Sequence, residues 1–139
     1  MRRRVSKEFP RWKNGKITSP MDEKYNCIAW AFGDTERKWW PNFTGHYWPS
    51  PKVTNHDLRD LQNYLLSQNW ISETSSTTTK NEANEKLAIY AIGEQLKHVA
   101  RHVGQNRWTS KLGDGHDVEH DLDDIAGPIY GEVVEIYYR

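Results

Sequence analysis

The residue with the clearest capacity for chemistry is Cys27, the single cysteine of the chain, which stands in the stretch Tyr25–Ala31. The residues after it are compatible with a helix, so we expect the thiol in the first helical turn. Backbone N–H groups point outward there and the helix dipole is positive, which favours a thiolate and lowers the thiol pKa. A cysteine in that environment is a candidate nucleophile. The alternative is a buried cysteine that acts only as a small hydrophobic residue.

A cysteine nucleophile needs a base within hydrogen-bond reach, and the base needs a partner that orients it. His98 is the candidate base, because it lies at the start of a segment with a strand pattern. The next predicted strand contains Ser110, on the face that it shares with Trp108. The sequence therefore predicts a Cys27–His98 pair, with Ser110 as one candidate for the third member.

Two histidine pairs raise the question of a metal site. His98 and His102 are four residues apart, as are His116 and His120. On a helix each pair would share a face and could chelate an ion. On a strand, however, residues four apart are separated by roughly 13 Å. Neither pair includes the glutamate of a zinc-protease helix. We therefore expect no metal and no cofactor.

Aromatic residues are concentrated between residues 35 and 51, where prolines punctuate the chain. Either this segment covers the core near Cys27, or it forms a wall that binds a glycan, a peptide or a nucleic acid. Large exposed aromatic patches are rare on monomers, which favours the first possibility. A binding module without catalysis is the alternative function. The expected substrate contacts are Asn26, Trp40, Trp48, Trp108 and Lys111.

The pattern along the chain predicts an α+β domain, with N-terminal helices packed on a C-terminal antiparallel sheet. The first helix runs from Tyr25 to about Gly33, with Asp22 or Asn26 as its cap. A second helix spans residues 54–68, with Thr54 or Asn55 as its cap. Its apolar stripe is formed by Leu58, Leu61, Leu65 and Leu66.

Strand patterns dominate the second half of the chain. We predict strands at 86–92, 97–103, 107–112 and 132–138, and a short one at 70–71, with one or two helical turns at 118–125. Residues 72–85 are rich in Ser, Thr, Asn and Glu and are expected to form a loop. Residues 1–20 are predicted to form a basic arm with a possible short hairpin, and residues 21–139 a single domain.

Composition limits the partners. Lys and Arg total 19, as do Asp and Glu, so the net charge is about zero. A neutral chain argues against a general nucleic-acid or membrane-surface binder. One cysteine excludes an internal disulfide framework, so a cytoplasmic location is the default expectation. The expected partner is a peptide- or protein-like substrate, and the sequence leaves the oligomeric state open.

The sequence resembles the papain-like superfamily of cysteine peptidases and amidases. In that pattern a helix begins at the cysteine, here Cys27, a later strand begins at the histidine, here His98, and the next strand carries a third polar residue, here Ser110. The closer similarity is to its small NlpC/P60 and CHAP-type branch. The segments YNCIAWA, HVARH and RWTSKLG are also similar to an uncharacterised family of bacterial proteins. The resemblance implies a papain-like fold and a cysteine-dependent hydrolase or acyl-transferase that acts on peptide or amide bonds.

The sequence departs from the superfamily pattern at two points. Asn26 precedes the cysteine in place of the usual Asp, Gly or Gln neighbours. The third catalytic position, which is usually His, Asn or Asp, matches Ser110. The orienting role therefore stays divided between His120 and Ser110, with Asp114 or Asp117 as further sources in the following loop.

Overall fold

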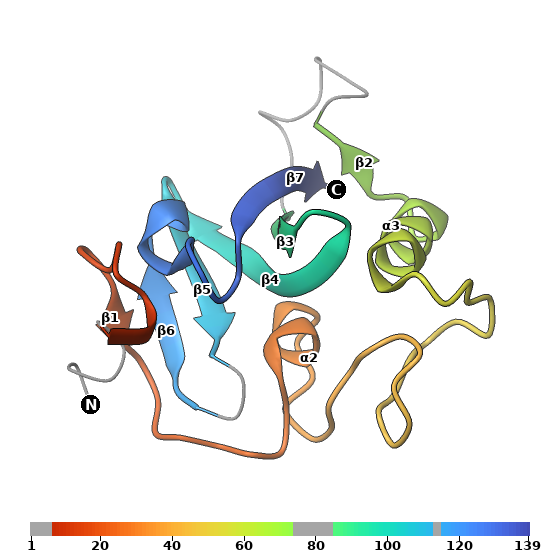
Figure 1. The fold of residues 1–139 in the computed structure, drawn as a ribbon, viewed down its shortest axis with the longest axis horizontal. Helices are drawn as coiled ribbons and strands as arrows, with labels where there is room; N and C mark the ends of the chain where they lie inside the picture. Colours follow the sequence, from red (N-terminus) through yellow and green to blue (C-terminus); the bar gives the residue numbers. More distant parts are fainter. Residues whose placement is uncertain (1–6, 74–84, 113–114) are drawn as a thin grey trace.

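The computed structural model describes residues 7–73, 85–112 and 115–139 and is an α+β fold with one antiparallel sheet (Figure 1). The seven strands lie in the order β1-β6-β5-β4-β3-β7-β2. The elements, in chain order, are β1 (Lys16–Ile17), α2 (Cys27–Ala31), α3 (Asp57–Ser67), β2 (Ile71–Ser72), β3 (Lys86–Ile92), β4 (Gln95–Gly104), β5 (Arg107–Lys111), β6 (Asp117–His120), the 3₁₀ turn η2 (Leu122–Ile125) and β7 (Glu132–Tyr138).

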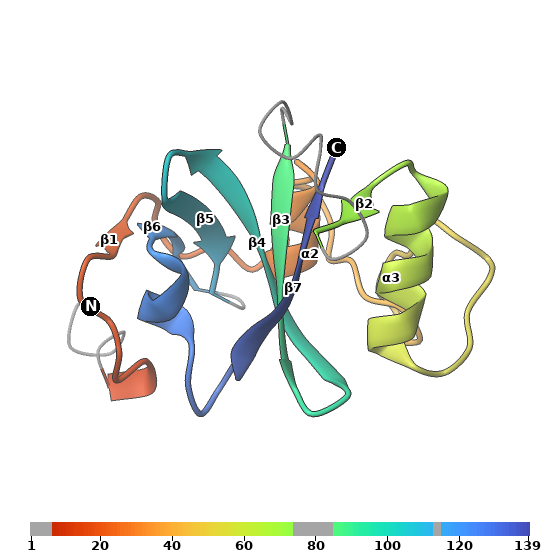
Figure 2. The ribbon, with the colours of Figure 1, turned by 90° about the horizontal axis from the view of Figure 1, so that it is seen from above.

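The long strands β3, β4 and β7 form the centre of the sheet, with α3 on one side of them and β1 and β6 on the other (Figure 2). The pairing of β3 with β4 sets Ile89 opposite Val99 and Tyr90 opposite His98. Directly opposed residues of an antiparallel pair share a face of the sheet. Val99 and His98 therefore project to opposite faces, which decides the surroundings of the candidate base.

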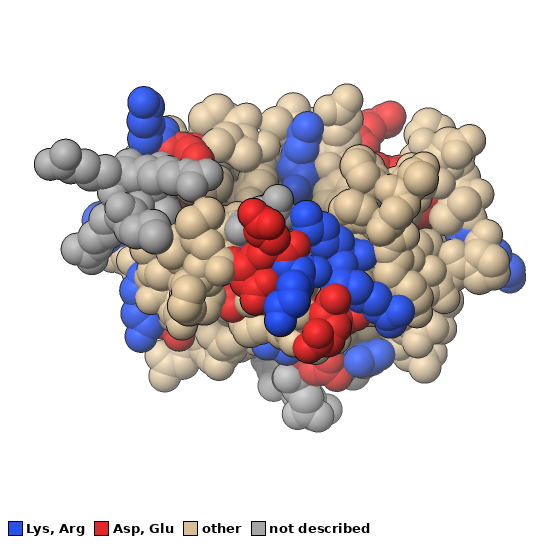
Figure 3. Space-filling model, turned by 90° about the horizontal axis from the view of Figure 1, so that it is seen from below, with Lys and Arg blue, Asp and Glu red and all other residues tan. Residues whose placement is uncertain are grey.

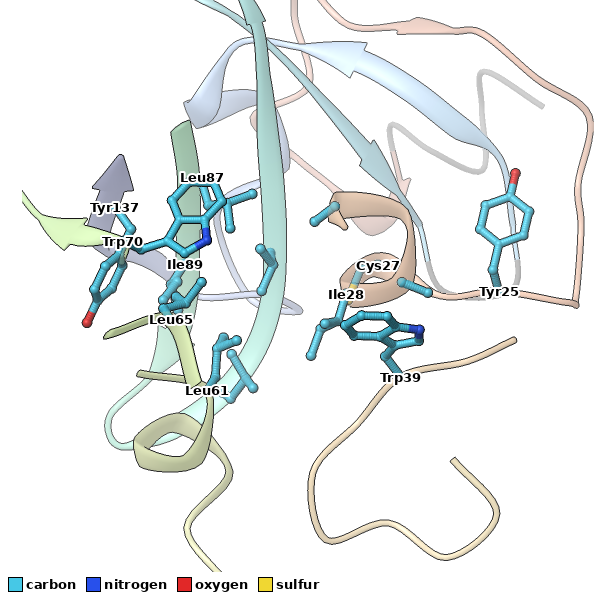
Figure 4. Close-up of a cluster of buried hydrophobic side chains, with 14 residues drawn as sticks. Tyr25, Cys27, Ile28, Trp39, Leu61, Leu65, Trp70, Leu87, Ile89 and Tyr137 are labelled. Carbon is cyan, nitrogen blue, oxygen red and sulfur yellow. The ribbon is translucent and has the colours of Figure 1, made fainter. Parts of the chain in front are cut away.

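Both helices pack on one face of the sheet, where the larger hydrophobic cluster forms (Figure 4). Leucines of α3 meet Leu87 and Ile89 of β3, and α2 adds Cys27 and Ile28. Trp39 belongs to the same cluster and stacks on Phe32 at 5.2 Å between ring centroids. The aromatic segment therefore covers the core near Cys27, which confirms the first of its two predicted roles.

The opposite face is covered by the N-terminal arm and the turn η2. Phe9 is buried there, 2% exposed, in a cluster with Tyr90, Trp108 and Ile125. The carboxylate of Asp124 accepts hydrogen bonds from the backbone N–H groups of Lys13 and Asn14, at 2.8 and 3.0 Å. The described part of the predicted arm is thus packed against the sheet.

Most predicted elements are confirmed, and the differences have physical causes. The strands predicted at 86–92 and 132–138 match β3 and β7 in full. The helix predicted at 118–125 is wrong over its first half, because residues 117–120 form β6 and pair with β5. The sheet is not purely C-terminal, since β1 and β2 occupy its two edges.

The two helices are shorter than predicted. Helix α2 begins after Asn26, one of the two predicted caps, and ends at Ala31. Helix α3 begins at Asp57, so neither Thr54 nor Asn55 is its cap. The hydroxyl and N–H of Thr54 instead bind the buried carboxylate of Asp60. The loop predicted at 72–85 lies mostly outside the described residues.

Candidate active site

The start of helix α2 is fixed by the side chain of Asn26. Its Oδ1 accepts a hydrogen bond from the N–H of Ala29 at 3.2 Å, which satisfies one of the free donors of the first turn. Cys27 is the first helical residue, as the sequence predicted. The helix has only five residues, so its dipole is weak.

Burial dominates the chemistry of the Cys27 thiol. The residue is 6% exposed, and burial raises the thiol pKa to about 11. Hydrogen bonding from the backbone N–H groups of Val99, Ile28 and Cys27 itself opposes this shift without cancelling it. The sequence-based expectation of a lowered pKa is therefore wrong, because the cost of burying a thiolate exceeds the stabilisation from a single helical turn. The thiol is protonated at neutral pH.

His98 lies on β4 and is fully buried. Neither of its ring nitrogens has a hydrogen-bond partner among the described residues. The ring instead stacks on Tyr130, at 4.1 Å between centroids and 12° between planes, and meets the edge of Tyr90 at 5.5 Å. Burial, and secondarily the charge of nearby His120, lowers the pKa of His98 well below its usual value. The imidazole is therefore neutral, with both nitrogens unused.

Cys27 and His98 approach β4 from different sides. Cys27 packs in the cluster under the helices and accepts from the N–H of Val99, the residue after His98. His98 faces the other cluster together with Tyr130. The pKa of Tyr130 is raised by burial and also by the charge of Cys27, so the phenol and thiol are within electrostatic reach. The thiol therefore meets β4 at the residue next to His98, and it makes no hydrogen bond with either imidazole nitrogen.

The two candidates for the third position bind each other. Ser110 Oγ lies 2.7 Å from Nε2 of His120, and Nδ1 of the same ring lies 2.8 Å from the carbonyl oxygen of Asp121. A carbonyl only accepts, so Nδ1 carries the hydrogen, and Nε2 accepts from the Ser110 hydroxyl. Burial is the first cause of the lowered pKa of His120. Neither residue hydrogen-bonds to His98.

Of the two aspartates named for the orienting role, Asp117 makes no hydrogen bond with His98. Asp114 lies outside the described residues. Asp117 Oδ2 accepts the hydroxyl of Tyr25 at 2.8 Å, on the face that carries α2. Its Oδ1 is buried without a partner among the described residues. The orienting contact on His98 is therefore aromatic in the described part of the chain.

The five expected substrate contacts are dispersed, and several are occupied by the fold. The Asn26 amide binds Ala29 and Trp39. Trp108 is 5% exposed and Lys111 fully buried, with its ammonium group on the backbone carbonyls of Asp22 and Gly115. These three side chains have structural partners, and the two buried ones do not face solvent.

The remaining two expected contacts, Trp40 and Trp48 of the aromatic segment, are partly buried. Trp40 donates its indole N–H to Asp57 at 2.8 Å, and Trp48 packs on Tyr64 at 5.5 Å. Phe43 of the same segment is 58% exposed. The segment therefore uses most of its aromatic surface to join α2 to α3.

The surface carries charges of both signs. Figure 3 shows basic and acidic side chains beside one another near the middle of one face. Within residues 7–73, 85–112 and 115–139, three or more His, Cys, Asp or Glu side chains never gather in a group that could hold a metal ion. In that same part of the chain, no helix is both long and apolar enough to cross a membrane.

The sequence analysis did not identify Tyr130 as a site residue. Its ring stacks on His98, and burial, together with the charge of Cys27, raises its pKa. The signal that could have found it is an aromatic residue directly before Gly131, where a turn delivers its side chain to the sheet. Its partner His98 lies far away in sequence, so no local pattern connects the two.

None of the curated proteins and none of the solved structures matches the chain. The family model described as "Domain of unknown function (DUF7689)" matches residues 16–138, from β1 to the end of β7. That match spans nearly the whole chain, and the protein therefore belongs to the DUF7689 family.

Proposed function

We propose that the protein is a cysteine-dependent hydrolase or acyl-transferase of papain-like type that acts on peptide or other amide bonds. Cys27 is the nucleophile and His98 the base. One observation carries the proposal. The imidazole of His98 is buried and neutral, with no hydrogen bond on either nitrogen among the described residues, and the next residue, Val99, donates its backbone N–H to the Cys27 thiol. A buried polar side chain without a partner is costly, which favours a functional reason for it.

The uncharged pair suits general-base catalysis. Pairing of β4 with β5 ends at Arg101, which leaves the edge of β4 at His98 and Val99 unpaired on that side within the described part of the chain. Across this edge His98 takes the thiol proton as Cys27 Sγ attacks the carbonyl carbon, so the positive charge develops on the imidazole only during the reaction. The electron pair of the carbonyl moves to its oxygen, and the Cys27 N–H is positioned to donate to that oxyanion. When the carbonyl re-forms, the C–N bond breaks and His98 gives its proton to the departing amine.

The second half of the reaction restores the enzyme. Water, or an amine in a transfer reaction, attacks the thioester carbonyl while His98 accepts its proton. The C–S bond then breaks, and His98 returns the proton to the sulfur. The order of elements supports this assignment, because a helix that begins at the cysteine packs on β4, the strand that carries the histidine.

A small acyl donor is the appropriate first probe, because Cys27 is only 6% exposed. We expect p-nitrophenyl acetate to acetylate Cys27, with release of nitrophenolate and a mass increase located on the peptide that contains Cys27. Cys27→Ser abolishes this labelling. His98→Gln slows it by about 10² or more, since a general base contributes on that order.

His102→Gln is the matched control, because His102 lies on the same strand, four residues on, with its ring on the carbonyl of Gln105. Its labelling rate should equal that of the wild type. Equal labelling of Cys27 in the wild type and His98→Gln would overturn the proposal. So would a native protein whose Cys27 stays unlabelled while the urea-unfolded chain reacts.

A further inference from the structure

The imidazole of His98 is oriented without a hydrogen bond. Both nitrogens lack partners among the described residues, so no polar contact there fixes the rotation of the ring. Two neighbouring aromatic rings fix its rotation instead. The Tyr130 ring lies parallel to the imidazole at 4.1 Å between centroids, and the Tyr90 ring stands edge-on at 5.5 Å. His120 is the contrast, since both of its nitrogens are held at 2.7 and 2.8 Å by polar partners.

Tyr130 is itself held firmly over the sheet. Gly127 and Gly131 exchange two backbone hydrogen bonds of 2.9 and 2.8 Å, which close the loop that carries it. Gly131 has φ +75° and presses on β3, where a Cβ would lie 2.1 Å from the carbonyl oxygen of Ala91. The ring of Phe9 packs on the Tyr130 ring, with 5.2 Å between the ring centroids. The ring therefore lies on a backbone that cannot shift without breaking these contacts.

We propose that Tyr130 is the positioning residue of the site, and that its ring holds the His98 imidazole by stacking, in the role for which a polar third member was expected. This inference rests on the proposed function of Cys27 and His98. Stacking leaves both imidazole nitrogens without a hydrogen-bond partner among the described residues, so one of them is free to take the thiol proton.

The same contact supports the reaction after proton transfer. An imidazolium over the face of a tyrosine ring is attracted by the ring quadrupole. Tyr130 therefore favours the charged form of His98 that arises during attack, while burial keeps the resting imidazole neutral. Because the ring supplies both effects, the phenolic hydroxyl is dispensable.

The test compares Tyr130→Phe, which keeps the ring, with Tyr130→Met, which fills similar space without one. In protein labelled with ¹⁵N-histidine, stacking at 4.1 Å places the imidazole protons in the shielding region of the Tyr130 ring. We expect the His98 signals to stay in place in Tyr130→Phe and to move downfield in Tyr130→Met. Acetylation of Cys27 should remain within about twofold in the first and fall about tenfold or more in the second.

Tyr64→Met is the control, because Tyr64 is a partly buried aromatic residue of α3 in the other cluster. It should leave the His98 signals unchanged. Loss of labelling in Tyr130→Phe would overturn the inference, as would unmoved His98 signals in Tyr130→Met. The wild type gives a test without a variant, since absence of cross-relaxation between the Tyr130 ring and the imidazole also overturns it. Failure of the proposed function is separate and shows as an unlabelled Cys27 in the wild type.

Discussion

The side-chain amide of Asn26 binds both backbone polar groups of Trp39. Its Nδ2 donates to the Trp39 carbonyl at 2.8 Å, and its Oδ1 accepts from the Trp39 N–H at 3.1 Å. The same Oδ1 caps α2 through Ala29. One side chain thus ties the first turn of the cysteine helix to the aromatic segment that covers it.

Replacing Asn26 should destabilise the whole helical face. Asn26→Ala removes a cap and two further hydrogen bonds, and we expect a loss of about 2–3 kcal/mol in the free energy of unfolding. Asn26→Asp retains the acceptors but cannot donate to the Trp39 carbonyl, so it should fall between alanine and wild type near neutral pH. Urea unfolding followed by tryptophan fluorescence measures both.

Asn63→Ala is the matched control for the Asn26 variants, because Asn63 is an exposed asparagine on α3. Its free energy of unfolding should change by less than about 0.5 kcal/mol. Equal effects at the two positions would show that the contact between Asn26 and Trp39 does not stabilise the fold.

The core of the fold was predictable from the sequence because its strands carry strong local signals. A continuous apolar run before Gly93 defines β3, and an alternating pattern after Gly131 defines β7. The strand β6 was missed, because Val118 and its neighbours form a strand only by pairing with β5. Its helical prediction rested on local propensity, which pairing with a distant strand overrides.

Residue type and position make Cys27 and His98 candidates in the sequence but say nothing of their protonation. The raised thiol pKa depends on burial of Cys27 in the hydrophobic cluster beneath the helices, which also contains Trp39. The pairing of Ser110 with His120 depends on the register of β5 and β6. Such contacts join distant segments and leave no signal in one stretch of sequence.

The neutral histidines predict a loss of stability in mild acid. The pKa of His98 is lowered by burial, so below the unfolded value of about 6.5 the unfolded chain binds a proton that the folded protein does not. The stabilisation is therefore complete above that value and declines as the pH falls. The slope is up to about 1.4 kcal/mol per pH unit for each such histidine. His98→Gln should flatten the fall in unfolding free energy measured by urea titration between pH 7.5 and 5.

Asn63→Ala serves as the comparison for this slope, because Asn63 is exposed on α3 and carries no titratable group. It should leave the dependence on pH unchanged. His120→Gln should reduce the slope as well, since burial also lowers the pKa of His120. A slope in His98→Gln as steep as in the wild type would contradict the assignment of a neutral, buried imidazole.

Alanine substitutions at two glycines with positive φ allow the stability cost of backbone strain to be measured apart from the cost of steric crowding. Gly45 has φ +87° and no heavy atom within 4 Å of the position that a Cβ would take, whereas at Gly131 that position is 2.1 Å from the Ala91 carbonyl oxygen. Gly45→Ala should cost about 1 kcal/mol, from the left-handed conformation alone. Gly131→Ala should cost about 3 kcal/mol or more, because the backbone of β3 must also move. Thermal and urea unfolding measure the difference, and similar costs at the two sites would contradict the close packing of the Tyr130 loop on β3.

The buried carboxylate of Asp124 anchors the N-terminal arm. It is 2% exposed and accepts from the N–H groups of Lys13, Asn14 and Asp121 at 2.8–3.0 Å. Asp124→Ala leaves these donors unsatisfied, so the arm should detach more often, and tryptic cleavage after Arg11 or Lys13 should be about tenfold faster or more. Limited proteolysis with mass spectrometry measures the rate.

The neighbouring Asp123 provides the control, because its replacement removes a negative charge without removing the hydrogen bonds to Asp124. It pairs with Arg11 at 3.1 Å, but its side chain is 75% exposed, and exposed ion pairs contribute little. Asp123→Ala removes the same charge and should change the cleavage rate by less than about twofold. If the two alanine variants were cleaved equally fast, attraction between the basic arm and the acidic turn would hold the arm, and the hydrogen bonds to Asp124 would not. A fast rate in Asp124→Ala alone means that the arm is held by a buried acceptor, which also keeps Phe9 against the ring of Tyr130.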